Sequence, residues 1–282
     1  MVSMSWIDPD GVETAFLGVA AGTAGRGLPP VRPLVTSQPN RSGAVYSGAL
    51  HGVRRISIPF EIFADAYPGE SELRTSVRAW ARRLSTLTAP GKLRWTSELG
   101  DQREIVAWYV GGLELVEPGN AMHQAATLEF DCPDPYPVDT TDSVQTASTG
   151  SSSGMFFPVG PALFLAASEI AAELTIDNTG DLECWPVISV TGPATSATVR
   201  NLTSGQVLAL SGAIGGGEVV TLDARPGART VLRQDGASLY SSMTSRQWWP
   251  LAKGQNRVRL EATGTTAASQ LSVRWRRRWL AA

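Results

Sequence analysis

The 282-residue chain is poor in the residues that build most metal and redox sites. It has two cysteines and two histidines, too few for a disulfide framework or for a zinc site made of these residues alone. The longest apolar stretch, residues 155–167, is interrupted by prolines and a glycine and is shorter than the roughly 20 residues of a membrane helix. Asp8-Pro9-Asp10 stands where a secretory signal would need a basic segment. We therefore expect a soluble protein made in a cytoplasm, with no cofactor, metal or membrane anchor.

The chain also lacks an excess of charge of one sign. The chain has 24 basic and 26 acidic residues, a formal net charge of −2, whereas a protein that wraps nucleic acid needs a basic surface to displace counterions. The hydrophobic fraction of 43% is sufficient for buried cores, and 28 glycines and 18 prolines are typical of a protein with many turns. The length favours two domains.

One helix is predicted in the first half, over residues 70–87. Its apolar residues recur at steps of four and three and so form a single stripe: Leu73, Val77, Trp80, Leu84 and Leu87. Pro90-Gly91 ends the pattern. A stripe of this width needs a surface to pack on, and we expect that surface to be a sheet.

Alternating apolar residues predict the strands of that sheet. The clearest run is residues 56–62, in which Pro59 lacks an N–H for a ladder and indicates an edge strand or a bulge. The other runs are Leu93 and Trp95; Val106, Trp108 and Val110; Leu128, Phe130 and Cys132. Three prolines within residues 131–137 end the pattern. Residues 1–138 are thus predicted to form one α+β domain, a β-sandwich or sheet with a single packed helix.

The rest of the chain is predicted to be β without a comparable helix. Residues 139–160 begin with a polar Ser/Thr/Gly-rich segment that is typical of a linker or long loop. Residues 161–282 contain short alternating runs separated by turn signals, which predicts a β-sandwich or jelly roll. The fold class is therefore mainly β.

Several segments, taken in order, resemble the distal tail (Dit-like) proteins of long-tailed, non-contractile bacteriophages. In the first half these are residues 6–11, 53–63, 93–104 and 128–136. In the second half they are residues 176–181, 185–193, 199–205, 217–223 and 249–256, which are similar to the family's C-terminal galectin-like sandwich. No segment is specific by itself, but their order is. The resemblance spans nearly the whole chain and departs most in residues 20–40, which are expected to be a Gly- and Pro-rich loop.

The resemblance implies a structural role in the virion. Family members form a hexameric ring at the distal end of the tail, which joins the tail tube to the tail-tip hub and leaves a lumen that DNA crosses. Their C-terminal domains point outward and in some members carry receptor-binding proteins. The expected partners are therefore the chain itself, the tube protein, the hub protein and a receptor-binding protein, without specific binding to nucleic acid. Residues 20–40 and 139–154 are the candidate contacts between chains.

No convincing catalytic constellation emerges from the sequence, and we predict that the chain is not an enzyme. His51 and His123 are far apart in sequence, and the Gly-x-Ser-x-Gly match at residues 150–154 lies in the polar linker rather than between a strand and a helix. The remaining candidates favour turns and loops: the carboxylate pairs Asp131/Asp134 and Glu114/Glu117, the turn Asp8–Gly11, and the glycine clusters 22–27 and 215–217.

Two surface candidates remain. Arg274, Arg276, Arg277 and Arg278 are interleaved with Trp275 and Trp279, a pattern that could contact nucleic acid. A buried Trp275 between solvent-facing arginines, or a contact with an acidic patch of a neighbouring subunit, is the favoured interpretation. In Trp248-Trp249, one ring is expected to close the sandwich core. Trp248 is then the candidate exposed aromatic.

The leading hypothesis is thus a distal tail ring subunit. The alternative is a carbohydrate-binding or receptor-recognition tail protein, which predicts an exposed aromatic platform, and a cell-wall glycan hydrolase is the third hypothesis. Cys132 and Cys184 fall in different predicted domains, so reduced thiols are expected.

Overall fold

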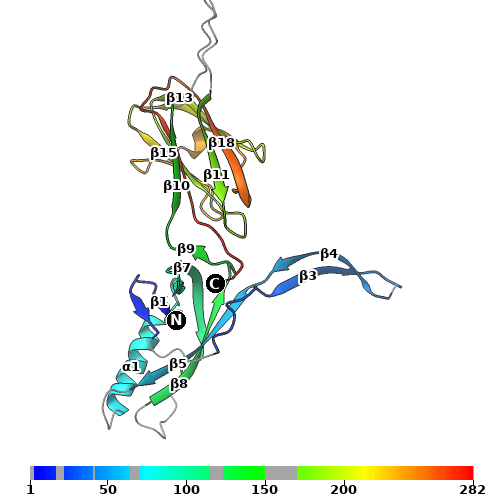
Figure 1. Ribbon diagram of the computed structural model, residues 1–282, viewed down its shortest axis with the longest axis vertical. Helices are drawn as coiled ribbons and strands as arrows, with labels where there is room; N and C mark the ends of the chain where they lie inside the picture. Colours follow the sequence, from blue (N-terminus) through cyan, green and yellow to red (C-terminus); the bar gives the residue numbers. More distant parts are fainter. Residues whose placement is uncertain are drawn as a thin grey trace, which may run out of the picture. The chain divides into compact units, whose positions relative to one another are not determined.

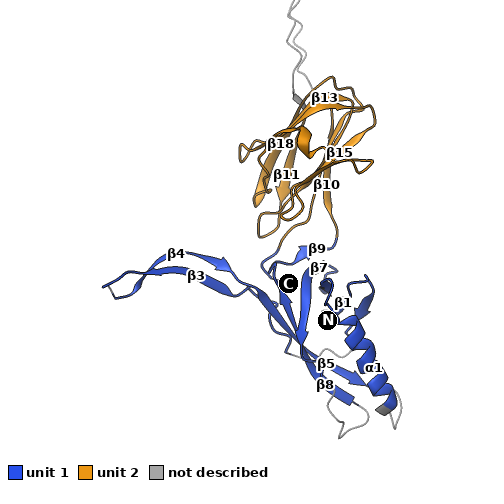
Figure 2. Ribbon diagram, turned by 180° about the vertical axis from the view of Figure 1, so that it is seen from behind, with its two compact units in different colours: residues 1–140, 279–282 blue, residues 141–278 orange. Residues whose placement is uncertain are grey.

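The computed structural model describes residues 3–16, 22–40, 42–63, 70–114, 123–149 and 170–281. The chain divides into two compact units: unit 1 comprises residues 1–140 and 279–282, and unit 2 comprises residues 141–278 (Figure 2). These bounds differ from the predicted ones because the last four residues join unit 1. They also differ because residues 143–148 form a strand of unit 2 rather than a linker.

Unit 1 is built on a seven-stranded antiparallel sheet. The strand order is β2-β1-β6-β7-β8-β5, and β9 pairs with β7. The bounds are β1 (Ser3–Ile7), β2 (Glu13–Ala15), β5 (Arg54–Phe63), β6 (Gly91–Thr96), β7 (Gln102–Gly111), β8 (His123–Cys132) and β9 (Val138–Asp139). The predicted strand runs thus all lie in this sheet, and the mainly β fold class with a single packed helix is confirmed.

The edge position predicted from Pro59 is confirmed, because β5 ends the strand order. The outer edge of β5 pairs with Ala24, whose N–H and C=O bond the main chain of Ser57. Pro59 lies two residues further on, so its missing N–H falls on the same outer edge, where the ladder does not require it. The four apolar residues that alternate along β5 are buried by more than nine-tenths of their surface: Ile56, Ile58, Phe60 and Ile62.

Strand β7 is present as predicted, but the alternating residues that predicted it do not form its buried face. Val106 and Val110 are 42% and 50% exposed, whereas Ile105 and Ala107 are buried. The register places Ile105 opposite the buried Leu93 of β6, and residues directly opposite in a sheet share a face. Since β7 is apolar in both phases, its sequence cannot show which phase faces the core.

Helix α1 (Glu70–Arg83) covers this sheet with Leu73 and Val77. It ends four residues before the predicted end at Leu87, which is 94% exposed. Ser85, Thr86 and Thr88 disfavour a further turn, because their hydroxyls compete for main-chain groups; Thr86 Oγ1 accepts the N–H of Tyr109 at 3.2 Å. The indole of Trp6 donates to the Arg83 carbonyl at 2.7 Å, which satisfies one of the terminal C=O groups of the helix.

Two further strands form an arm instead of the predicted loop. β3 (Val31–Ser37) and β4 (Ala44–His51) pair only with each other and run out from the rest of unit 1 as a long hairpin (Figure 1). We call residues 31–51 the arm. The predicted loop over residues 20–40 therefore contains a strand, although residues 20 and 21 lie outside the described part of the chain.

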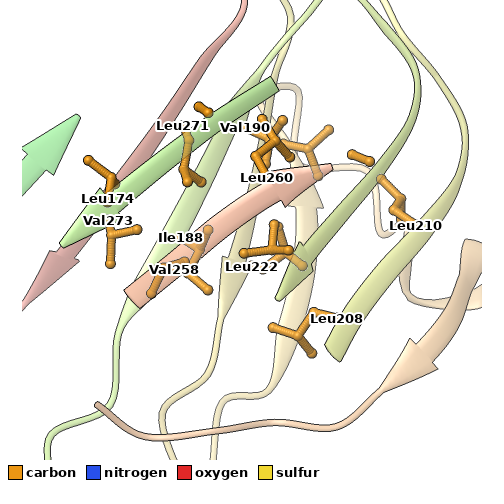
Figure 3. Close-up of a cluster of buried hydrophobic side chains, with 14 of the residues drawn as sticks. Leu174, Ile188, Val190, Leu208, Leu210, Leu222, Val258, Leu260, Leu271 and Val273 are labelled. Carbon is orange, nitrogen blue, oxygen red and sulfur yellow. The ribbon is translucent and has the colours of Figure 1, made fainter. Parts of the chain in front are cut away.

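Unit 2 is a sandwich of two five-stranded antiparallel sheets, as predicted. One sheet has the order β10-β19-β12-β15-β16 and the other β11-β18-β13-β14-β17. The bounds are β10 (Ser143–Ser148), β11 (Ile170–Asn178), β12 (Val187–Thr191), β13 (Ala194–Asn201), β14 (Val207–Ile214), β15 (Val219–Asp223), β16 (Thr230–Arg233), β17 (Met243–Arg246), β18 (Gly254–Thr263) and β19 (Gln270–Trp275). Apolar side chains of both sheets meet in one core (Figure 3).

Three buried asparagines hold the turns of unit 2. Asn178, Asn201 and Asn256 are each exposed by 1% or less, and each bonds main-chain groups within four residues. Asn256 makes three such bonds: Oδ1 accepts the Ala252 N–H at 2.9 Å, and Nδ2 donates to the carbonyls of Ala252 and Gly254, both at 2.8 Å. The three asparagines occur in three of the segments that carry the family resemblance. Holding a turn is therefore a structural explanation for the resemblance of those segments.

Candidate functional site

The arm exposes apolar side chains on both of its faces. Each of six residues is exposed by at least 39%: Val31, Leu34, Val35, Val45, Tyr46 and Leu50. The register pairs Val35 with Tyr46 on one face and places Leu34 and Leu50 on the other. A lone two-stranded hairpin is marginally stable in water, and contiguous exposed apolar surface marks an interaction site. The arm is therefore the leading candidate for a protein contact.

The charge of the arm differs from that of the rest of unit 1. The arm contains two arginines, Arg32 and Arg41, and neither aspartate nor glutamate. The remainder of unit 1 carries 16 acidic and 10 basic residues. The arm is thus basic and the remainder is acidic, and opposite charges on two surfaces favour their association.

Two of the four arginines predicted to form a surface cluster share one acidic partner. Arg276 Nε donates to Asp142 Oδ1 at 2.6 Å, and Arg274 Nη1 lies 3.9 Å from Asp142 Oδ2. Arg277 instead donates to Thr179 Oγ1 at 3.2 Å, and Arg278 accepts the Asp181 N–H with its main-chain carbonyl at 2.9 Å. Arg274 and Arg276 thus lie beside Asp142, whereas Arg277 and Arg278 contact residues 179–181.

The tryptophans between these arginines have separate environments. Trp275 continues the buried face of β19 and is 7% exposed, as predicted from the alternation with Leu271 and Val273. Trp279 belongs to unit 1, where the Arg103 guanidinium lies 4.0 Å from its ring centroid. Stacking of nucleic-acid bases on both rings together has no support in this arrangement.

The second surface candidate offers less aromatic area than expected. Trp249 is fully buried, as predicted, and closes the core of unit 2. Trp248 is partly buried against the same core. A sugar-stacking platform needs an open ring face, so the carbohydrate-binding alternative gains no support from this pair.

The candidate catalytic groups have structural partners. His51 Nδ1 lies 2.8 Å from the Tyr136 hydroxyl, whereas His123 stacks on Phe63 and lies 3.9 Å from Glu61. The pKa of Asp131 is held below its ordinary value by hydrogen bonds from Arg55. Glu117 and residues 150–154 lie outside the described residues.

The turns and glycine clusters also have structural explanations. Asp8 Oδ1 accepts the Val12 N–H at 2.8 Å, as expected for a turn. The carbonyls of Gly25 and Gly27 face the Arg54 guanidinium at 3.0 and 2.9 Å, so this loop presents acceptors to a cation rather than N–H groups to a phosphate. At the other cluster, the Gly215 N–H donates to the Glu218 carboxylate at 2.7 Å.

The two cysteines are free and buried, one in each unit. Burial raises the pKa of Cys132 to about 12, which makes it a poor nucleophile. Over the described ranges, no group of His, Cys, Asp and Glu could hold a metal ion. Within the same part of the chain, no helix is both long and apolar enough to span a membrane.

Comparison with known proteins confirms the resemblance seen in the sequence. Residues 179–279 match the family of the siphovirus-type tail component, C-terminal domain. No curated protein sequence matches the chain. The crystal structure of SPP1 Dit (gp 19.1), described as a paradigm of the hub adsorption apparatus in phages infecting Gram-positive bacteria, is similar in fold. Its TM-score is 0.70 at 15% identity, over 99% of both chains.

Two structures of the phage P2 baseplate in its activated conformation are also similar. The form with Ca gives a TM-score of 0.55 at 12% identity, and the form with Sr gives 0.54 at 12% identity. Each match covers 98% of both chains. The fold of the whole chain is therefore that of Dit and baseplate proteins of phage tails.

Proposed function

We propose that the chain is a structural subunit of the distal end of a phage tail, where it forms a homohexameric ring between the tail tube and the tail-tip hub. The ring leaves a central lumen for DNA, and its outer side is a platform for receptor-binding proteins. The role is mechanical rather than catalytic. The fold match over 99% of the chain supports this role, and the exposed arm is the observation that carries it.

The arm supplies the contact that a ring of identical subunits needs. A head-to-tail contact between two different patches closes into a ring when the rotation between subunits permits it. In this proposal, the basic, apolar arm of one copy packs on the acidic remainder of the next copy's unit 1. Covering half-exposed apolar side chains contributes about 1 kcal/mol each, which offsets the entropy lost on association.

The first test is the mass of the purified chain by multi-angle light scattering over a range of concentrations. We expect a hexamer, or a monomer–hexamer equilibrium that shifts with concentration. The double variant Val35→Asp/Tyr46→Asp introduces two charges into the apolar face of the arm and is expected to be monomeric.

The matched control is Val144→Asp. Val144 lies on β10 of unit 2 and is 56% exposed, against 57% for Val35, so a general effect of a new surface charge would appear in both proteins. A wild-type chain that stays monomeric throughout, or an arm variant that associates like the wild type, contradicts the proposal.

A further inference from the structure

The C-terminal end of the chain is bound in unit 1 as a short peptide. We call residues 279–281 the tail. The main-chain N–H of Trp279 donates to the Pro137 carbonyl at 2.9 Å, and its indole N–H donates to Asp139 Oδ1 at 2.8 Å. Asp139 is 7% exposed, so this hydrogen bond to a charged group is shielded from water and stronger than one at the surface.

Arg103 holds the tail at two points. Its guanidinium lies 4.0 Å from the centroid of the Trp279 ring, within the range of a cation–π contact. The same side chain donates through Nη1 to the Ala281 carbonyl at 2.8 Å. Arg103 lies on β7 opposite Asp139 of β9, so the two strands place both partners of Trp279 side by side.

Arg54 holds the tail from the core of unit 1. It is 1% exposed, and it donates through Nη2 to the Leu280 carbonyl at 2.7 Å. Its Nη1 donates to the carbonyls of Gly25 and Gly27. Burial lowers the pKa of Arg54 from its ordinary value, because a buried cation loses hydration that these three carbonyls replace in part. Loss of the tail would remove one acceptor from a buried cation, so the empty site is disfavoured.

We propose that unit 1 contains a peptide-binding site for the C-terminal end of this chain, formed by Arg54, Arg103 and Asp139. These residues bind main-chain carbonyls and one tryptophan ring. Such contacts suit a short extended peptide that carries a tryptophan. The site is separate from the arm and does not depend on ring formation.

The site gives unit 2 a second attachment to unit 1, made by non-covalent contacts of the tail. The chain leaves unit 1 after residue 140 and returns at residue 279. With the tail bound, both ends of unit 2 are anchored in unit 1; with the tail released, only the connection at residues 140–141 remains.

The test uses a chain shortened by deletion of residues 279–282 and a fluorescein-labelled peptide of residues 277–282. By fluorescence anisotropy, we expect saturable binding to the shortened chain. Binding to the full chain is expected to be at least about tenfold weaker, because its own tail occupies the site at a high effective concentration. A peptide with Ala in place of Trp279 is expected to bind at least about tenfold more weakly, since it lacks the cation–π contact and the indole hydrogen bond.

Two variants of the shortened chain distinguish specific contacts of the peptide from a general effect of removing a positive charge. Arg103→Gln is expected to weaken the peptide at least about tenfold. Arg55→Gln removes the same charge from an exposed neighbour of Arg54 that pairs with Asp131, and it should leave peptide binding unchanged. Equal binding to the full and shortened chains, or equal effects of the two variants, overturns the proposal.

A measurement on the full chain covers the case in which the shortened chain does not fold. Hydrogen exchange at the Trp279 amide is expected to be slow in the wild type and faster in Arg103→Gln, but unchanged in Arg55→Gln. A Trp279 amide that exchanges as in an unstructured peptide overturns the proposal. The test also separates this inference from the proposed function, since tail binding is measured on the chain whether or not it forms a ring.

Discussion

The arm and the unit 2 sandwich consist of similar strands and differ in what covers them. Both are antiparallel and rich in apolar residues, yet Leu260 of β18 is 1% exposed and Leu50 of the arm is 51% exposed. The sandwich covers the apolar face of each sheet with the other sheet. In the described part of the chain, the strands of the arm pair with each other alone, and their apolar side chains are exposed. Unit 2 therefore buries the apolar faces of its sheets, and the arm leaves its apolar side chains exposed.

Hydrogen exchange should give the largest difference between these regions. In the unassembled chain, we expect amides of the arm to exchange through openings of near-zero free energy, whereas those of β18 need global unfolding, about 5–15 kcal/mol for a typical domain. Mass spectrometry of peptides covering residues 31–51 and 254–263 measures both regions at once. Of these two regions, the arm is the one expected to gain protection in the assembled protein. An arm that is already protected from exchange in the monomer would contradict the view that its apolar side chains are uncovered there.

A matched pair of leucines tests the same difference in stability. Leu260→Ala is expected to lower the free energy of unfolding by about 2–5 kcal/mol, because it leaves a cavity in a core. Leu50→Ala should change the stability of the monomer by less than about 0.5 kcal/mol. Urea denaturation measures both. Equal losses would mean that the arm packs within its own chain.

Substitution of a polar residue should likewise cost more stability in the interior of unit 2 than in the exposed arm. Asn256→Asp replaces an amide that donates to two carbonyls with a group that cannot donate when ionised, and it should cost about 1–3 kcal/mol of unfolding free energy. Asn40→Asp, in the exposed turn of the arm, is the control and is expected to be near neutral. Thermal denaturation of the two variants compares them. A neutral Asn256→Asp would argue against Asn256 as a turn-holding residue.

The smallest effect is expected on the outer surface of unit 2. Hydrogen bonds from Arg257 and Arg259 hold the pKa of Glu173 below its ordinary value of 4.5. Because the folded pKa lies below the unfolded one, the carboxylate stabilises the fold above pH 4.5, and this contribution is lost as the pH falls through the folded pKa.

The Glu173→Gln variant measures that contribution. It should be less stable than the wild type at pH 7 by less than about 1 kcal/mol, and the difference should shrink below pH 4.5. Thermal denaturation at pH 7 and pH 3.5 tests this. A difference that is the same at both pH values would contradict the role of the ionised carboxylate.

Local patterns were sufficient for most of the strands. Alternation predicts the buried faces of β5 and β19, and Pro59 predicts the edge position of β5, since side-chain direction and hydrogen-bonding capacity are properties of the local chain. They were insufficient for β7, where both phases are apolar and only the pairing with β6 selects Ile105 over Val106. The arm was missed because its prolines and glycines are also typical of a loop.

The candidate surfaces depended more on tertiary contacts. The sequence places four arginines and two tryptophans in six residues, but Trp275 turns into the core of unit 2 and Trp279 binds Arg103 of unit 1. Arg54 gave no signal in the sequence, because its role depends on carbonyls of residues 25, 27 and 280.

By itself, the sequence determined the mainly β fold, the helix stripe, the sandwich strands and the resemblance to distal tail proteins, because periodicity and turn chemistry operate over a few residues. Only the tertiary structure decided that the apolar side chains of the arm are exposed and that the tail returns to unit 1. The physical reason is that covering an apolar face, or supplying acceptors to a buried arginine, requires groups that are distant in the chain and are brought together by folding.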